Sequence, residues 1–201
     1  MLNFNHIRNR GDTLIEVLLA ITVFSLVAVG AMAIMNSGTA TSQRALEISL
    51  VRNEIDAQAE TLRFLNASYI ANYPSANYSG PAAQWKAISN SLPSVPIQSM
   101  NASCPTTKPN NSFIVDPRFA TFYNDKFNGQ PQTYSQVRYP DDTSPISAAD
   151  SIWIEGVKSG AGGTGETNIG YIDFYIRACW PSPGQTVPVI LQTIVRLYEP
   201  R

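Results

Sequence analysis

A single glutamate interrupts the most apolar stretch of the chain. Residues 17–43 contain no charged side chain, and Glu16 stands directly before them. An acidic residue costs about 2.5–3.5 kcal/mol at the centre of a membrane helix and less near its end. A carboxylate that is kept at this cost gains most from a cation supplied by a partner, because ion pairs are strong where the dielectric constant is low.

Other residue patterns give weaker indications of chemistry. Gly160, Gly162 and Gly165 spell G-x-G-x-x-G, but residues 169–178 behind them read as a strand. A nucleotide-binding loop needs a helix there, so that its N-terminus meets the pyrophosphate. We therefore interpret residues 158–168 as a hairpin loop that binds no cofactor.

The apolar stretch must be placed by a helix long enough to cross a membrane. Val17–Met35 contains nineteen residues, which make about 28 Å of helix against a hydrocarbon core of about 30 Å. Arg8 and Arg10 precede it, and Arg44 is the first charge after it. The positive-inside rule then puts the N-terminus in the cytoplasm and residues 44–201 outside. A secretory signal cleaved near Ala33 is the alternative, but a discarded peptide gains nothing from Glu16.

The residues around Glu16 read RGDTLIEVL from position 10 to 18. This segment resembles the N-terminal motif of type IV pilins and type II secretion pseudopilins. The resemblance implies that Met1–Gly11 is a leader, which a prepilin peptidase removes after Gly11 on the cytoplasmic side. The mature chain then starts at Asp12, its fifth residue is Glu16, and the helix is retained.

The resemblance also implies roles for the first mature residues. Asp12 is the candidate for N-methylation, although the family usually has phenylalanine there. Thr13, Leu14, Ile15 and Glu16 form the assembly segment, in which the carboxylate of Glu16 meets the N-terminal amine of a neighbouring subunit. Such a pair sets the axial register between subunits more than it adds stability, because unpaired charges are penalised.

The apolar helix is expected to continue as an amphipathic one. Apolar residues recur at intervals of three and four, which predicts a helix from Thr13 to about Ile70, ended by Asn72-Tyr73-Pro74. The stripe consists of Ile48, Val51, Ile55, Ala59, Leu62, Leu65 and Tyr69. The expected domains are a leader (1–11), a transmembrane or filament-core helix (12–35), an amphipathic continuation (36–72) and a globular head (73–201).

The head is predicted to be loop-rich at first and then a sheet. Residues 66–112 read as loop with a short helix at Pro81–Leu92. Alternating residues predict strands at Gln132–Tyr139, Ser151–Val157, Gly170–Ala178 and Val187–Tyr198. Together these strands predict an antiparallel meander with one face on the helix, and the fold class is α+β: a long N-terminal helix packed on an antiparallel head.

The two cysteines lie on the exported side. Oxidising conditions there favour a bridge between Cys104 and Cys179, and two buried thiols are the alternative. The bridge would connect the loop-rich middle of the chain to the strand that ends at Ala178.

The function that these features predict is a filament subunit and not an enzyme. Its partners are other pilin subunits, the prepilin peptidase and the pilus assembly platform in the inner membrane. We expect a single-pass protein of the cytoplasmic membrane with its C-terminal domain outside, which then enters an extracellular pilus. A minor pilin, exposed for adhesion, motility or contact with a surface ligand, is favoured by Asp12, the large head and the loop-rich middle.

Three alternatives are considered. A type II secretion pseudopilin shares the same assembly physics. A DNA-uptake pilin is disfavoured, because removal of Arg8 and Arg10 leaves twelve basic against fifteen acidic residues and no basic stripe. A membrane-anchored enzyme is disfavoured because the only histidine, His6, lies in the leader. The carboxylates left for catalysis or a metal are Asp141 with Asp142 and Glu155 with Asp173; they read as solvated, and no metal site is expected.

A bulky residue at position 11 tests the cleavage assignment. Gly11→Leu should leave an uncut precursor in the membrane, because the peptidase needs a small residue before the bond that it cuts. The mass of the purified chain reports this, and a normally processed variant would contradict the assignment.

Overall fold

The computed structural model describes residues 12–93, 103–159 and 170–200. The chain divides into two compact units, residues 1–43 and 44–201, and the helix α1 (Asp12–Ala71) contributes to both. A second helix, α2 (Gly80–Ser91), and eight strands belong to the second unit. The α+β class predicted from the sequence is confirmed.

Helix α1 follows from the local sequence. The chain has no proline before Pro74, so nothing interrupts the backbone ladder. Beyond Ala71 the chain turns: the N–H of Asn72 donates to the carbonyl of Tyr69 (3.1 Å), and the N–H of Tyr73 donates to the carbonyl of Ile70 (3.2 Å). The predicted helix and its end are confirmed to within one residue.

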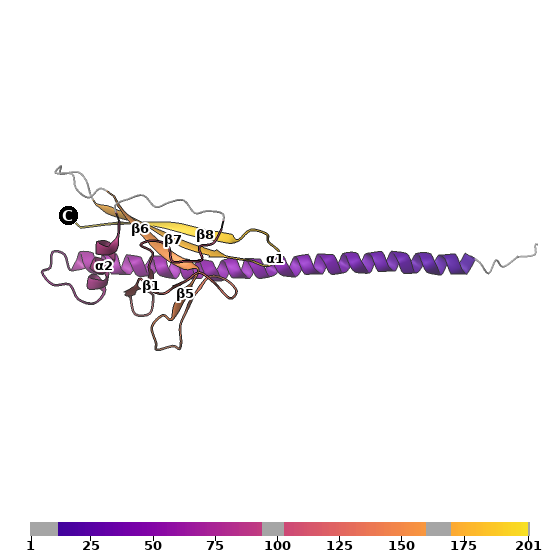
Figure 1. The fold of residues 1–201 in the computed structure, drawn as a ribbon, viewed down its shortest axis with the longest axis horizontal. Helices are drawn as coiled ribbons and strands as arrows, with labels where there is room; N and C mark the ends of the chain where they lie inside the picture. The colour runs from indigo at the N-terminus through magenta and orange to yellow at the C-terminus, as the bar shows by residue number, and fades with distance from the viewer. Residues whose placement is uncertain (1–11, 94–102, 160–169, 201) are drawn as a thin grey trace, which may run out of the picture. The chain divides into compact units, whose positions relative to one another are not determined.

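The main sheet is an antiparallel meander of three strands. It consists of β6 (Ile152–Ser159), β7 (Tyr171–Trp180) and β8 (Val189–Tyr198), in that spatial order. Figure 1 shows these strands, in orange and yellow, alongside the C-terminal part of α1. The last three predicted strands are therefore confirmed.

The core lies between this sheet and the apolar stripe of α1. Ile172, Phe174 and Ile176 alternate along β7 and are fully buried. They share one cluster with the predicted stripe residues Val51, Ile55, Ala59, Leu62 and Leu65. Trp85 of α2 completes it, with its ring 5.6 Å from that of Phe174.

The prediction for Gln132–Tyr139 is wrong in extent and in place. Only β4 (Gln136–Arg138) forms, and it belongs to a separate sheet with β3 (Phe127–Asn128) and β5 (Ala148–Asp150), in the order β3-β5-β4. Strands β3 and β5 are parallel, so this sheet is mixed. Strand β4 pairs antiparallel with β5 and buries Val137, and its Arg138 Nε lies 2.6 Å from a carboxylate oxygen of the buried Asp150.

A backbone kink separates the two sheets. Ser151 has a φ of 48°, a conformation that L-residues seldom adopt, and it lies between β5 and β6. The chain therefore leaves one sheet and enters the other at a single residue. A third sheet, the hairpin of β1 (Ile114–Asp116) and β2 (Thr121–Tyr123), also lies where the sequence predicted no strand.

One buried glutamine holds this hairpin to α1. The side chain of Gln58 is fully buried within the apolar stripe. Its Nε2 donates to the carbonyl of Val115 (2.9 Å), and its Oε1 accepts from the N–H of Val115 (3.0 Å). The amide thus completes the hydrogen bonds of one buried backbone unit.

Replacement of this amide should destabilise the second unit. Gln58→Leu would leave two buried backbone groups unpaired, and we expect the free energy of unfolding to fall by about 2–4 kcal/mol. Denaturant unfolding of the full chain in detergent, followed by tryptophan fluorescence, measures the change. Gln43→Leu, at an exposed position of the same helix, is the control, and equal stability of the two variants would contradict the role of Gln58.

Candidate functional site

The first unit presents an apolar helix surface with no covering. The large apolar side chains between residues 14 and 35 range in exposure from 52% at Val23 to 75% at Ile34. They cover all sides of the helix: Leu14, Ile15, Val17, Leu18, Leu19, Ile21, Val23, Phe24, Leu26, Val27, Val29, Met32, Ile34 and Met35. A surface of this kind marks a site that contacts a membrane or another protein.

The hydroxyl groups within this surface are already satisfied. Thr22 donates to the carbonyl of Leu19, and Ser25 donates to the carbonyl of Ile21, both at 2.8 Å. A helix in hydrocarbon needs such internal partners, because no water is present to replace them. Within the described residues, α1 is the one helix apolar enough to cross a membrane, with a mean hydropathy of 2.6 over its most apolar window.

Glu16 is the exception on this surface. Its side chain is exposed, and it has neither a hydrogen bond nor an ion pair to any residue that the structure describes. Leu14 and Ile15 beside it are 66% and 70% exposed. Asp12 is the first residue of α1 and Thr13 the second, while Gly11 and the rest of the leader lie outside the described residues.

Glu155 and Asp173, the carboxylates considered together from the sequence, each pair with an arginine. Glu155 lies 2.7 Å from the guanidinium of Arg177, and Asp173 forms two hydrogen bonds with Arg196, at 2.7 and 2.8 Å. Each carboxylate is therefore neutralised by a different arginine on the sheet. The hydrogen bond with Asp173 raises the pKa of Arg196, so this pair stays charged.

Asp141 closes a loop. One of its carboxylate oxygens accepts from the backbone N–H groups of Thr143 (2.8 Å) and Ser144 (2.7 Å), and the other accepts from the hydroxyl of Ser144 (2.7 Å). These bonds lower the pKa of Asp141 to about 2. A carboxylate held ionised by its own loop is not arranged as a general acid. Among the described residues, no cluster of three or more metal-ligating side chains is found.

The glycine motif at residues 160–165 lies outside the described residues. The strand expected after it is present as β7. That position matches the hairpin interpretation, since a nucleotide-binding loop would lead into a helix.

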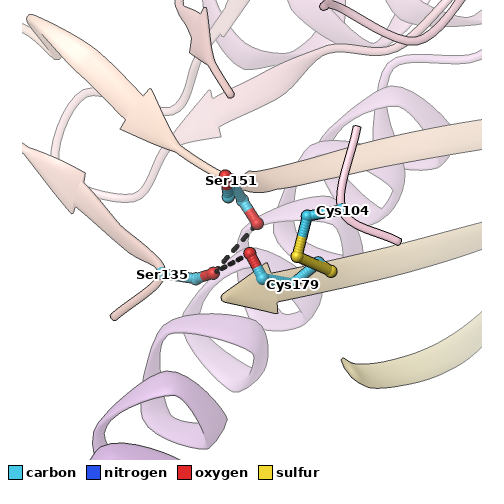
Figure 2. The surroundings of a disulfide bond; sticks show 4 residues. All are labelled: Cys104, Ser135, Ser151 and Cys179. Atoms are coloured by element: carbon cyan, nitrogen blue, oxygen red, sulfur yellow. Dashed lines mark hydrogen bonds between the residues drawn. A yellow bond between two sulfur atoms is a disulfide. The ribbon is translucent and has the colours of Figure 1, made fainter. Parts of the chain in front are cut away.

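Cys104 and Cys179 are joined by a disulfide across 75 positions of sequence. Cys179 lies in β7, and Figure 2 shows the bridge beside Ser135 and Ser151. The buried hydroxyl of Ser135 lies 3.0 Å from the carbonyl of Ser151 and 3.2 Å from that of Cys179, and donates toward both. The bridge therefore attaches the segment at Cys104 to the place where the main sheet meets the kink at Ser151.

Two further polar residues of α1 were not identified from the sequence. Glu47 accepts from Trp180 Nε1 (2.9 Å) and from the hydroxyl of Ser182 (2.7 Å). Asn66 donates to the carbonyl of Tyr198 (3.2 Å). Their partners are more than 130 positions away, so no local pattern could reveal them. Gln58 could have been noticed in the sequence, because it is a polar residue directly before Ala59 of the apolar stripe.

Comparison with known families is informative for the N-terminal segment. Residues 7–32 match the family model described as the prokaryotic N-terminal methylation motif. The N-terminal segment, which continues as the long helix α1, is therefore that of a type IV pilin-like protein. The matched residues include Gly11, Asp12 and Glu16, and the motif is one of structural, pilin-type proteins. No curated protein and no solved structure matches the chain, so the head of this pilin-like protein must be interpreted from its own structure.

Removal of the disulfide should destabilise the pilin-like head. For a closed loop of this length, the loop-entropy model gives about 4 kcal/mol. The double variant Cys104→Ser/Cys179→Ser should lose that amount in denaturant unfolding of the full chain. Reductant should lower the stability of the unmodified protein equally and leave the double variant unchanged; no effect of reductant on the unmodified protein would contradict this role.

Proposed function

We propose that this protein is a subunit of a type IV pilus-like filament, and that it is a minor pilin. The observation that carries the proposal is the uncovered apolar surface of residues 14–35, in which Glu16 is the single charged side chain. Covering a large apolar side chain contributes about 1.5–3 kcal/mol, so fourteen of them favour burial strongly. A membrane provides this cover before assembly, and the same segments of other subunits provide it afterwards.

Processing prepares the N-terminus for assembly. Prepilin peptidase cuts between Gly11 and Asp12, and the new amine at Asp12 is the site of N-methylation. The chain then comprises the helix of residues 12–35 for the filament core, its amphipathic continuation to residue 72, and the head of residues 73–201. The leader contributes Arg8 and Arg10, which keep the N-terminus in the cytoplasm until cleavage.

Glu16 supplies specificity in the filament core. Its carboxylate has no partner among the described residues of its own chain, and the amine of Asp12 in a neighbouring subunit has the opposite charge. The pair forms only at one axial offset between two helices. Other offsets leave both charges unpaired in an apolar medium, which is strongly unfavourable.

The head faces the exterior of the cell. Arg8 and Arg10 before the span support this orientation, and the Cys104–Cys179 disulfide is of the kind that persists in oxidising compartments. Exposed aromatic residues such as Tyr73, Phe119 and Tyr198 offer contact sites on the head for adhesion or motility.

Loss of the Glu16 carboxylate should block assembly after normal processing. Glu16→Ala is expected to be cleaved and to remain in the membrane, because its helix is more apolar than the original. Its amount in sheared surface filaments should fall by about tenfold or more, since the amine of Asp12 would be left unpaired. Quantitative mass spectrometry of the sheared fraction measures this.

The matched control is Glu60→Ala, which removes an exposed acidic residue of the same helix. This variant should enter filaments normally. Full incorporation of Glu16→Ala would contradict the proposed role of the carboxylate. The unmodified protein should be a scarce component of the same fraction, and its absence from surface filaments would contradict the minor pilin assignment.

A further inference from the structure

Strand β8 lies at one edge of the main sheet. The hydrogen bonds of the sheet show which of its residues direct their backbone groups away from β7. The N–H of Cys179 donates to the carbonyl of Ser151 (3.0 Å), so odd-numbered residues of β7 bond toward β6. In an antiparallel sheet the alternate residues bond on the other side. Even-numbered residues of β7 therefore bond to β8, and the even-numbered residues of β8 direct their backbone groups outward.

These outward groups remain available. At the end of the strand, the side chain of Asn66 donates a hydrogen bond to the carbonyl of Tyr198. At Ile190, Gln192, Ile194 and Arg196, the outward N–H and C=O groups have no partner in the part of the chain that the structure describes. Four alternate residues of β8 thus each offer one backbone donor and one backbone acceptor, which is the pattern that an added strand requires.

The opposite edge of the same sheet is covered by the chain itself. Phe113 and Ile154 exchange two backbone hydrogen bonds, at 3.0 and 2.8 Å, on the outer side of β6. The N–H of Lys158 donates to the carbonyl of Pro93 (3.3 Å). Among residues 12–93, 103–159 and 170–200, no backbone group covers the centre of the β8 edge in this way.

The edge of β8 also lacks the protection that natural edge strands carry. Residues 189–195 contain neither a charged side chain nor a proline, two of the features that usually guard such edges; Pro188 lies just before the strand and protects only its start. Ile190 and Ile194, two of the residues with outward backbone groups, have side chains that are 37% and 56% exposed. Arg196, the single charged residue within β8, is neutralised by Asp173. An uncharged, β-branched edge of this kind associates with other strands unless it is occupied.

We propose that β8 receives an extended, uncharged segment of a different protein, which pairs with Ile190–Arg196 as a fourth strand of the sheet. Backbone hydrogen bonds supply the affinity. Apolar side chains at alternate positions of the segment lie beside Ile190 and Ile194. The uncharged centre of the edge, from Ile190 to Val195, selects against charged segments, because it offers no counter-charge to compensate their desolvation.

A second copy of this chain does not fit the edge. Strand β8 runs in the direction of α1, because Val189 pairs with Trp180, which bonds to Glu47, whereas Tyr198 bonds to Asn66. Two β8 strands paired antiparallel would direct their helices oppositely, which one membrane does not allow. Paired in parallel, they place the helices on opposite faces of one sheet and use the β8 edge of both copies, so the contact does not propagate into a filament. This exclusion of a second copy rests on the proposed function. The unpaired backbone groups of the β8 edge are observed independently of it.

Photocrosslinking in producing cells tests the proposal with the full-length protein. A photoreactive residue replaces Gln192, and the matched control places it at Gln185, an exposed glutamine before β8. We expect an adduct with a different protein at 192 and none at 185. Peptide mapping should place the link in an uncharged segment with alternating apolar residues.

Substitutions at Ile194 show whether the contact is strand pairing. Ile194→Pro removes an outward N–H without breaking a bond to β7, so the adduct at 192 should be lost. Ile194→Lys should have the same effect, because it adds a protective charge, while Ile194→Thr should retain the adduct. Circular dichroism of each variant confirms that the head is folded.

Two results would overturn the proposal. An adduct that contains this chain alone would refute the different protein as occupant. No adduct, or one that both Ile194→Pro and Ile194→Lys retain, would refute strand pairing at the edge. Filament assembly is scored in the same cells with Glu16→Ala, so that failure of the edge is distinguished from failure of the proposed function.

Discussion

Exposure of fourteen large apolar side chains on α1 to water is strongly unfavourable, so this surface must be covered by a membrane or by another protein. The hydroxyls of Thr22 and Ser25 are satisfied within the helix, so the surface is suited to hydrocarbon. Glu16 is the single charged side chain on this surface, so it distinguishes one axial position along the helix from all others. In the proposed function, membrane anchoring and the order of subunits in a filament thus depend on the same few turns of helix.

The second unit secures its own part of α1 by two kinds of contact. The apolar stripe supplies the burial, which is large but does not fix the register of the helix against the sheet. Glu47, Gln58 and Asn66 supply that register, since each bonds to a different place in the head: Trp180, Val115 and Tyr198. The disulfide adds a covalent tie where the sheets meet.

The sequence predicted the regular elements well, and the irregular ones poorly. The second half of helix α1 and strands β6–β8 have long periodic patterns, and burial follows those patterns over most of their length. Trp153, Arg177 and Cys179 are exceptions, since they are buried against the alternation. Strands β1–β5 have two or three residues each, too few for a period to show. Their places depend on single contacts instead, such as that of Arg138 with the buried Asp150 and the kink at Ser151.

The sequence alone determined the apolar rod, the position of its carboxylate and the family motif, because these depend on composition and spacing along one helix. Tertiary structure decided which carboxylates of the head are neutralised, which polar side chains pin the helix, and which edge of the sheet stays open. Those outcomes depend on residues more than twenty positions apart in the chain, as with Asp173 and Arg196 or Glu47 and Trp180. Such pairs leave no local pattern, since their geometry exists only once the chain has folded.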